Sequence, residues 1–236
     1  MRAIITGISG VALPFQPRGR SDRFCQLGLQ AVEAALYDAK FECDERNRER
    51  TAIVVGTAFG CHATNAEHFR QLLDGETVRP RRFTYTLPSA VAGEIAIQFA
   101  IRGPVLTLAG SLCTGLDALD EAQRLIGRGG ADHALVVAID EKTSLRDSEE
   151  RAFAVLLDRA RDGAAPSFAV RHAFVAGQPD RALSLALEGA PATRLVSTRP
   201  SAAAALELMG NARLGDRPSA VAASDPSGAA TVLIWK

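Results

Sequence analysis

The segment from residue 103 to 119 constrains the fold more than any other part of the chain. Its apolar residues 104–109 predict a strand that ends in a sharp turn of small residues at Gly110. A helix predicted over residues 113–128 follows at once, with Cys113 in its first turn. A strand that leads directly into a helix is typical of α/β folds, and a helix N-terminus lowers the pKa of a thiol placed there. The segment therefore predicts layered α/β structure and makes Cys113 a candidate nucleophile.

Hydrophobic periodicity predicts alternating strands and helices along the rest of the chain. An amphipathic pattern predicts a helix over residues 22–39, and the linker at 159–166 is polar and contains glycine and proline breakers. Residues 225–228 form a predicted tight hairpin turn. This alternation argues for an α/β layered fold with a mostly parallel sheet. The other expected elements are strands at 2–12, 51–57, 133–139, 151–158, 167–175, 193–197, 219–224 and 229–235, helices at 63–74, 88–100 and 201–213, and a basic loop at 75–82.

The segment 103–119 resembles the nucleophile elbow of β-ketoacyl synthases, which belong to the thiolase superfamily. Three further segments resemble the same enzymes in the order in which the family has them. Residues 52–61 resemble the strand and glycine turn of the amino-terminal half, residues 82–97 the helix before the nucleophile strand, and residues 129–140 the strand after the nucleophile helix. The resemblance covers residues 1–160 as a ketosynthase-like amino-terminal half and implies a thiolase-like layered fold.

The chain departs from the family pattern at the nucleophile itself. The family places the reactive cysteine two residues before the Thr or Ser that precedes the helical glycine. Counted back from Gly115, that position is Leu112, and Cys113 stands one place later. One step along a helix rotates a side chain by about 100°. Cys113 is therefore either a displaced nucleophile or a small buried thiol, and we expect the second, because a buried free cysteine usually behaves as a hydrophobic residue.

The resemblance weakens in residues 161–236, which we expect to form a reduced, truncated carboxy-terminal half of the same globular unit. Ketosynthases carry two histidine turns there that stabilise developing charge. Residues 195–208 take the place of the second turn without its lysine, glycine or histidine, and nothing matches the first. Of the family's glycine-rich loop beside the active site, the turn at 225–228 keeps only Gly228.

The four histidines of the chain are expected to have ordinary structural or solvated roles. A dyad of one of them with Cys113 remains an open alternative. These histidines are His62, His68, His133 and His172.

Composition and spacing exclude several classes of function. The formal net charge is zero, which gives no electrostatic footprint for nucleic acid or for an anionic membrane. No apolar run reaches membrane-spanning length, and residues 1–7 turn polar too soon for a signal peptide. No His-x-x-x-His or Cys-x-x-Cys pair suggests a metal site, and the four cysteines have irregular spacing. We expect a cytoplasmic protein with reduced thiols, no metal and no cofactor.

The departures from the family pattern favour a catalytically degenerate homologue. Such a chain would act as a non-condensing partner, like the chain-length factors of type II polyketide, aryl polyene and fatty-acid-type biosynthesis. Leu112 would fill the space of the thiolate. Ser111, Phe59 and Leu116 are expected near the tunnel or the dimer seam, although Phe59 and Leu116 fit a plain core equally well. The expected partners are an active ketosynthase subunit in a heterodimer, or a second copy in a homodimer, and an acyl carrier protein.

Two alternatives belong to other classes. Cys113 could accept an acyl group in an acyltransferase or thioesterase-like enzyme, which would need a nearby base and backbone N–H donors. The chain could also be a homodimer that binds acyl chains or carrier protein without chemistry. Basic residues Arg79, Arg81 and Arg82 could meet an acidic carrier protein, although a solvated loop explains them as well.

Overall fold

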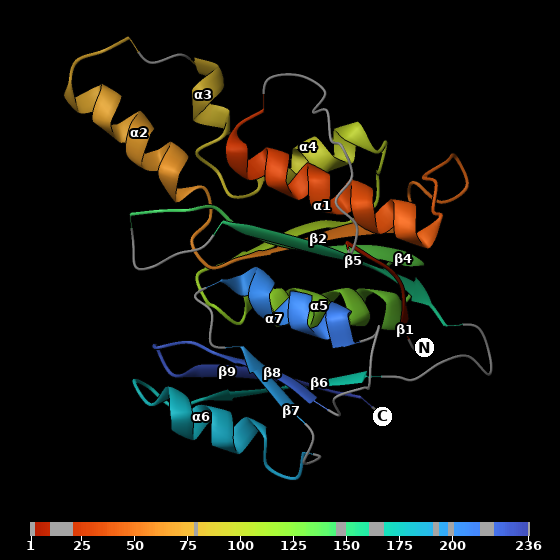
Figure 1. Ribbon diagram of the computed structural model, residues 1–236. Coiled ribbons are helices and arrows are strands. Elements are labelled where there is room, and N and C mark those ends of the chain that lie inside the picture. Colours follow the sequence, from red (N-terminus) through yellow and green to blue (C-terminus); the bar gives the residue numbers. More distant parts are fainter. Residues whose placement is uncertain are drawn as a thin grey trace.

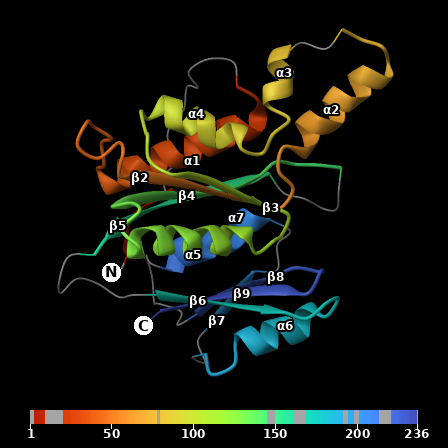
Figure 2. The ribbon, with the colours of Figure 1, turned by 180° about the vertical axis from the view of Figure 1, so that it is seen from behind.

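The computed structural model describes residues 3–9, 21–77, 80–144, 150–160, 168–190, 194–197, 201–212 and 220–235. These residues form five stacked layers of helices and sheets (Figure 1). Helices α1 (Arg23–Ala39) and α4 (Ala90–Gln98) cover the outer face of a first sheet. Helices α5 (Thr114–Gly127) and α7 (Ala202–Ala212) lie between this sheet and a second one (Figure 2). Helix α6 (Pro179–Ala186) covers the outer face of the second sheet.

The first sheet has five strands in the order β1-β5-β4-β2-β3. The central strands β2 and β4 run parallel, and β3 continues the parallel part as the edge strand. Strand β5 runs antiparallel to both β4 and β1. The strand bounds are β1 Ala3–Ile8, β2 Thr51–Thr57, β3 Val105–Ala109, β4 His133–Asp140 and β5 Arg151–Arg159.

The second sheet has four strands in the order β6-β9-β8-β7. Only β7 and β8 pair in parallel, while β9 runs antiparallel to β6 and β8. The layered α/β class is confirmed, but the expectation of a mostly parallel sheet is wrong, because the β8–β9 hairpin and β5 reverse direction and make both sheets mixed. The strand bounds are β6 Phe168–Phe174, β7 Arg194–Ser197, β8 Ala220–Ser224 and β9 Ala229–Trp235.

Two glycines let the start of α5 pack closely against its neighbours. A Cβ atom on Gly56 of β2 would lie 2.3 Å from the carbonyl oxygen of Thr114. A Cβ atom on Gly115 would lie 2.1 Å from the carbonyl oxygen of Ala202, at the start of α7. Only a residue without a Cβ fits at either position. The first turn of α5 is therefore wedged between the first sheet and α7.

Most predicted elements appear within two residues of their expected bounds, with two exceptions. The basic loop expected at 75–82 contains the start of a short helix, α3 (Pro80–Thr84), which follows α2 (His62–Leu73). Helix α6 occupies a stretch in which no element was expected. The linker expected at 159–166 and the far end of the strand expected at 2–12 lie largely outside the described residues. None of the described helices is long and apolar enough to cross a membrane.

Candidate functional site

The turn between β3 and α5 is built from small residues that bond to one another. Gly110 has a φ of 115°, a conformation that favours glycine. The Thr114 hydroxyl donates to the Ser111 carbonyl at 2.7 Å, and the Cys113 amide donates to the Ser111 hydroxyl at 3.1 Å. These bonds fix the direction in which the next two side chains, Leu112 and Cys113, leave the backbone.

Leu112 stands at the start of α5, where the family pattern puts the nucleophile. It is half-buried, and its backbone N–H donates to the Asp225 carboxylate at 3.0 Å. Asp225 lies in the hairpin turn between β8 and β9, so the structure brings the nucleophile position and this turn together. The two residues are 113 positions apart in the sequence, and no local pattern relates them.

Cys113 points into the space between the central helices and the second sheet. It is 1% exposed, and its thiol donates to the carbonyl oxygens of Ala223 at 3.5 Å and Ala229 at 3.7 Å. Burial raises the pKa of this thiol above its usual value, and the nearby Asp117 and Asp225 carboxylates add to the effect. These contacts are those of a small structural thiol, although its reactivity is still a prediction.

The three residues expected at the tunnel or dimer seam have different environments. Leu116 is completely buried in the core between the two sheets. Ser111 is half-buried and belongs to the turn described above. Phe59 is half-buried just after β2, and its N–H donates to the Asp140 carboxylate at 3.2 Å. Because β2 and β3 are parallel, Phe59 and Ser111 lie at the same end of the first sheet, beyond the carboxyl ends of these strands.

Asp140 was not singled out from the sequence, yet its carboxylate binds several segments at this end of the first sheet. One carboxylate oxygen accepts hydrogen bonds from the Thr57 hydroxyl at 3.0 Å and from the Ala58 N–H at 2.8 Å. The other accepts from the Ser201 hydroxyl at 2.8 Å and from the Ala202 N–H at 2.7 Å, at the start of α7. Burial raises the pKa of Asp140, while these hydrogen bonds act in the opposite direction. An acid that ends an otherwise apolar strand was the available sequence signal.

The histidines lie on three separate elements. His62 and His68 are on α2, and the ring of His68 packs on Phe83 with centroids 6.0 Å apart. His133 opens β4 and bonds through Nδ1 to Asp158 at 2.7 Å, at the opposite end of the strand from Asp140.

His172 on β6 contacts Asp120 of α5 at 3.1 Å and the Thr231 hydroxyl of β9 at 3.3 Å. His172 shares a partner with Cys113, because the same Thr231 hydroxyl also acts to lower the pKa of the Cys113 thiol. The thiol itself donates to carbonyl groups rather than to an imidazole.

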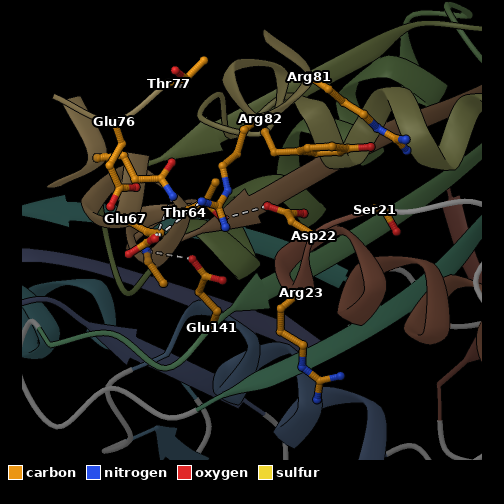
Figure 3. A pocket seen from close by; sticks show the side chains of 13 residues that line it. Ser21, Asp22, Arg23, Thr64, Glu67, Glu76, Thr77, Arg81, Arg82 and Glu141 are labelled. Atoms are coloured by element: carbon orange, nitrogen blue, oxygen red, sulfur yellow. Dashed lines mark hydrogen bonds and ion pairs between the residues drawn. The ribbon is translucent and has the colours of Figure 1, made fainter. Parts of the chain in front are cut away.

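A separate cavity of about 850 Å³ lies between the start of α1, α2 and α3 (Figure 3). Its wall carries both signs of charge: Arg82 pairs with Glu67 at 3.5 Å, and Asp22 accepts from the Thr64 hydroxyl at 3.0 Å. Glu141 is buried at its base and accepts from the Ala63 N–H at 2.9 Å. Leu112, Cys113 and the other residues of the elbow are not part of this wall.

The basic residues proposed for carrier-protein contact belong partly to this cavity. Arg81 and Arg82 line it, whereas Arg79 lies outside the described residues. Within the described part of the chain, no group of three or more His, Cys, Asp or Glu side chains could hold a metal ion.

Curated proteins of similar sequence match about half of this chain. Nodulation protein E of Rhizobium leguminosarum bv. trifolii is 36% identical over 122 residues, which are 50% of this chain and 30% of that protein. The chain spans about a third of the length of the curated relatives it matches.

Two solved structures share the fold at low sequence identity. One is an acyl-carrier protein of a type II polyketide synthase in complex with its ketosynthase (AntDE:AntF), with a TM-score of 0.76 and 14% identity over 100% of this chain and 99% of that one. The other is a ketosynthase in complex with its chain length factor from Xenorhabdus doucetiae, with a TM-score of 0.63 and 14% identity over 99% of both chains.

The family itself is shown by a match that spans the elbow. Residues 12–178 match the family described as "Beta-ketoacyl synthase, N-terminal domain". This segment includes the first sheet from β2 onward, the turn before α5 and the whole of α5. Because the match covers more than half of the sequence, this chain belongs to the β-ketoacyl synthase family through its amino-terminal domain.

Proposed function

We propose that this chain is a non-condensing ketosynthase homologue that works beside an active ketosynthase, as a chain length factor does. The observation that carries the proposal is the first turn of α5. A leucine stands at the nucleophile position, and the neighbouring thiol, 1% exposed, donates to two carbonyl groups in the second sheet. Leu112 has no group that could form a thioester, so chain condensation would depend on another subunit.

The state of Cys113 supports the same conclusion. A thiolate, not a thiol, attacks a thioester, and burial raises the pKa of this thiol. A helix N-terminus acts in the opposite direction on a thiol, whereas burial is the first cause of the raised pKa of Cys113. Among the described residues, the thiol bonds to carbonyl groups and to no imidazole that could take its proton. An acyltransferase that uses Cys113 would need a lower pKa of this thiol and a contact between the thiol and an imidazole.

The edge strand β3 offers a surface for the partner subunit. An edge strand presents unpaired backbone groups, and Val105 on β3 is 46% exposed. The buried Thr107 hydroxyl of the same strand has no hydrogen-bond partner in the described residues. Ile97 of the neighbouring helix α4 is 81% exposed. We propose that a ketosynthase, or a second copy of this chain, pairs with this edge, and that an acyl carrier protein delivers chains to the pair.

Intact mass spectrometry after incubation with a short acyl thioester tests the absence of condensing chemistry. We expect no acyl adduct on the wild-type chain and none on Cys113→Ala. An adduct on the wild type that disappears in Cys113→Ala would contradict the proposal and identify an acyltransferase.

Light scattering after co-expression with a type II ketosynthase tests the partnership. We expect a complex of one copy of each chain, and we expect Val105→Asp on the edge strand to dissociate it. Phe174→Asp, at an exposed position of β6 in the second sheet, is the matched control and should leave the complex intact. A chain that stays alone beside the ketosynthase would contradict the partnership.

A further inference from the structure

The backbone N–H of Leu112 lies where an acyl-transfer enzyme would need a free hydrogen-bond donor. In acyl transfer, the oxyanion that forms on the carbonyl oxygen is stabilised by preorganised N–H donors. The N–H of the nucleophile residue itself is commonly one of these donors. At this position the Leu112 N–H already donates to the Asp225 carboxylate at 3.0 Å.

The carboxylate is held firmly in this place. Asp225 is 8% exposed, and its other oxygen accepts from the Ser227 N–H at 2.8 Å. A negative charge beside the start of α5 is favoured by the helix dipole. Gly228 fixes the turn, since its φ is 100° and a Cβ there would lie 1.9 Å from the Val175 carbonyl oxygen.

The turn that carries Asp225 has no spare N–H to replace the one it occupies. The Asp225 N–H donates to the Ala229 carbonyl and the Gly228 N–H to the Asp225 carbonyl, both at 2.8 Å. The Ser227 N–H is taken by the Asp225 side chain, and Pro226 has no N–H at all. Every backbone donor of residues 225–228 is therefore engaged or missing.

We infer that Asp225 is an internal anion that occupies the oxyanion position and keeps the site closed to acyl chemistry even when a thiol is supplied. The inference rests on the proposed non-condensing function. It adds a second change, independent of Leu112, that would prevent acyl transfer. A carboxylate at this point repels a developing oxyanion and also a thiolate at residue 112, because like charges a few ångströms apart in a buried site interact strongly. Asp225 also contributes to the raised pKa of the neighbouring Cys113 thiol.

The test installs the missing thiol with and without this carboxylate. The variants are Leu112→Cys, Leu112→Cys with Asp225→Asn, and Leu112→Cys with Asp225→Ala. The control pairs Leu112→Cys with Asp120→Asn, which removes a charge from α5 that bonds to His172 and Arg124 instead of Leu112. Each variant is incubated with acetyl-N-acetylcysteamine, and the adduct is located by peptide mapping. In this reaction the residue 112 thiolate forms a carbon–sulfur bond to the acetyl carbon, and the released N-acetylcysteamine thiolate takes up a proton.

We expect Leu112→Cys alone and its Asp120→Asn control to acylate slowly at residue 112. Removal of the Asp225 charge should accelerate acylation by about tenfold or more, equivalent to about one pKa unit of the installed thiol. Equal rates in Leu112→Cys and both Asp225 variants, or an equal gain in the Asp120→Asn control, would overturn the inference. An adduct at Cys113 in the wild type would instead contradict the proposed function, so the two failures are distinguishable.

A second measurement does not depend on the installed cysteine. In the chain with Leu112 intact, Asp225→Asn should increase the rate at which the native Cys113 thiol reacts with iodoacetamide, compared with Asp120→Asn. Asn keeps one carbonyl oxygen, which can accept from the Ser227 N–H and hold the turn, but its amide nitrogen cannot accept from the Leu112 N–H, so the charge and that hydrogen bond are lost together. An unchanged rate, with circular dichroism showing the same fold, would contradict a charge effect of Asp225 at this site.

Discussion

Leu112 and Cys113 are adjacent in the sequence, and both contact the β8–β9 hairpin, one at its turn and the other at its strands. The Leu112 N–H reaches the Asp225 carboxylate, whereas the Cys113 thiol reaches two carbonyl groups of the second sheet. The sequence predicted the displacement of the thiol by one position, because the spacing to Gly115 is local. The contact with Asp225 could not be predicted, because it depends on how a hairpin 113 residues further along the chain is placed.

The burial of Cys113 predicts low thiol reactivity. We expect iodoacetamide to modify Cys113 in the native protein slower than the half-buried Cys43, by about tenfold or more at neutral pH. The physical reason is access, because Cys113 is 1% exposed whereas Cys43 is half-buried, while burial raises the pKa of both thiols. Peptide mapping after timed quenching measures both sites in one sample. Equal labelling of the two thiols would show that Cys113 is open to solvent and restore it as a candidate nucleophile.

The buried Glu141 predicts a pH dependence of stability. Burial raises the pKa of Glu141 in the folded state above its unfolded value of about 4.3. The unfolded chain therefore loses this proton first as pH rises, and the free energy of unfolding falls from about pH 4.3 up to the folded pKa.

Glu141→Gln should remove this loss, because Gln keeps an oxygen that can accept the Ala63 N–H. We expect the melting temperature of Glu141→Gln, relative to the wild type, to be higher at pH 7 than at pH 4. Glu45→Gln, at an exposed position, is the control for general charge effects. A difference between Glu141→Gln and wild type that is the same at both pH values would contradict the prediction.

The sequence predicts the helices and strands correctly where the hydrophobic periodicity extends over several turns. Helix α1 is found over Arg23–Ala39 as expected, because its apolar positions repeat over four turns. Helix α6 has only eight residues, too few for a periodic pattern, and begins at Pro179 after a glycine that suggests a loop. The mixed sheet directions were missed for a different reason: strand direction depends on the partner strand, which no local pattern encodes.

The cap of α1 provides a test at this level. The Asp22 side chain accepts from the Cys25 N–H at 3.0 Å and from the Thr64 hydroxyl of α2 at 3.0 Å. We expect Asp22→Ala to lower the free energy of unfolding by about 1–2 kcal/mol, the usual cost of a lost N-cap. Ser89→Ala is the matched control, because Ser89 caps α4 without a side-chain hydrogen bond and should cost little. Urea denaturation of both variants measures the difference, and equal losses would rule out a specific role for the Asp22 cap.

The central layer joins the two sheets into one molecule, and its tightest point is the start of α5. Here the sequence and the structure agree, since Gly115 is the helical glycine of the family pattern and the structure shows why a larger residue is excluded. A Cβ on Gly115 would lie 2.1 Å from the Ala202 carbonyl oxygen and 3.3 Å from the Ala138 side chain. With a Cβ at residue 115, α5 would have to move away from α7 or push α7 away from the first sheet.

Gly115→Ala should therefore destabilise the whole molecule, whereas alanine normally stabilises a helix relative to glycine. We expect a loss of about 1–3 kcal/mol, typical of overpacking in a well-filled core, and a fall in melting temperature of about 2–4 °C per kcal/mol. Gly93→Ala is the matched control, because Gly93 lies inside α4 and a Cβ there would meet nothing within 4 Å. That variant should gain about 0.4–1 kcal/mol, since alanine reduces the freedom of the unfolded chain. Thermal melting of the two variants beside the wild type should thus move in opposite directions. If Gly115→Ala melts at or above the wild type, α5 and α7 do not pack as closely as the structure shows, and the placement of Leu112 beside Asp225 loses its support.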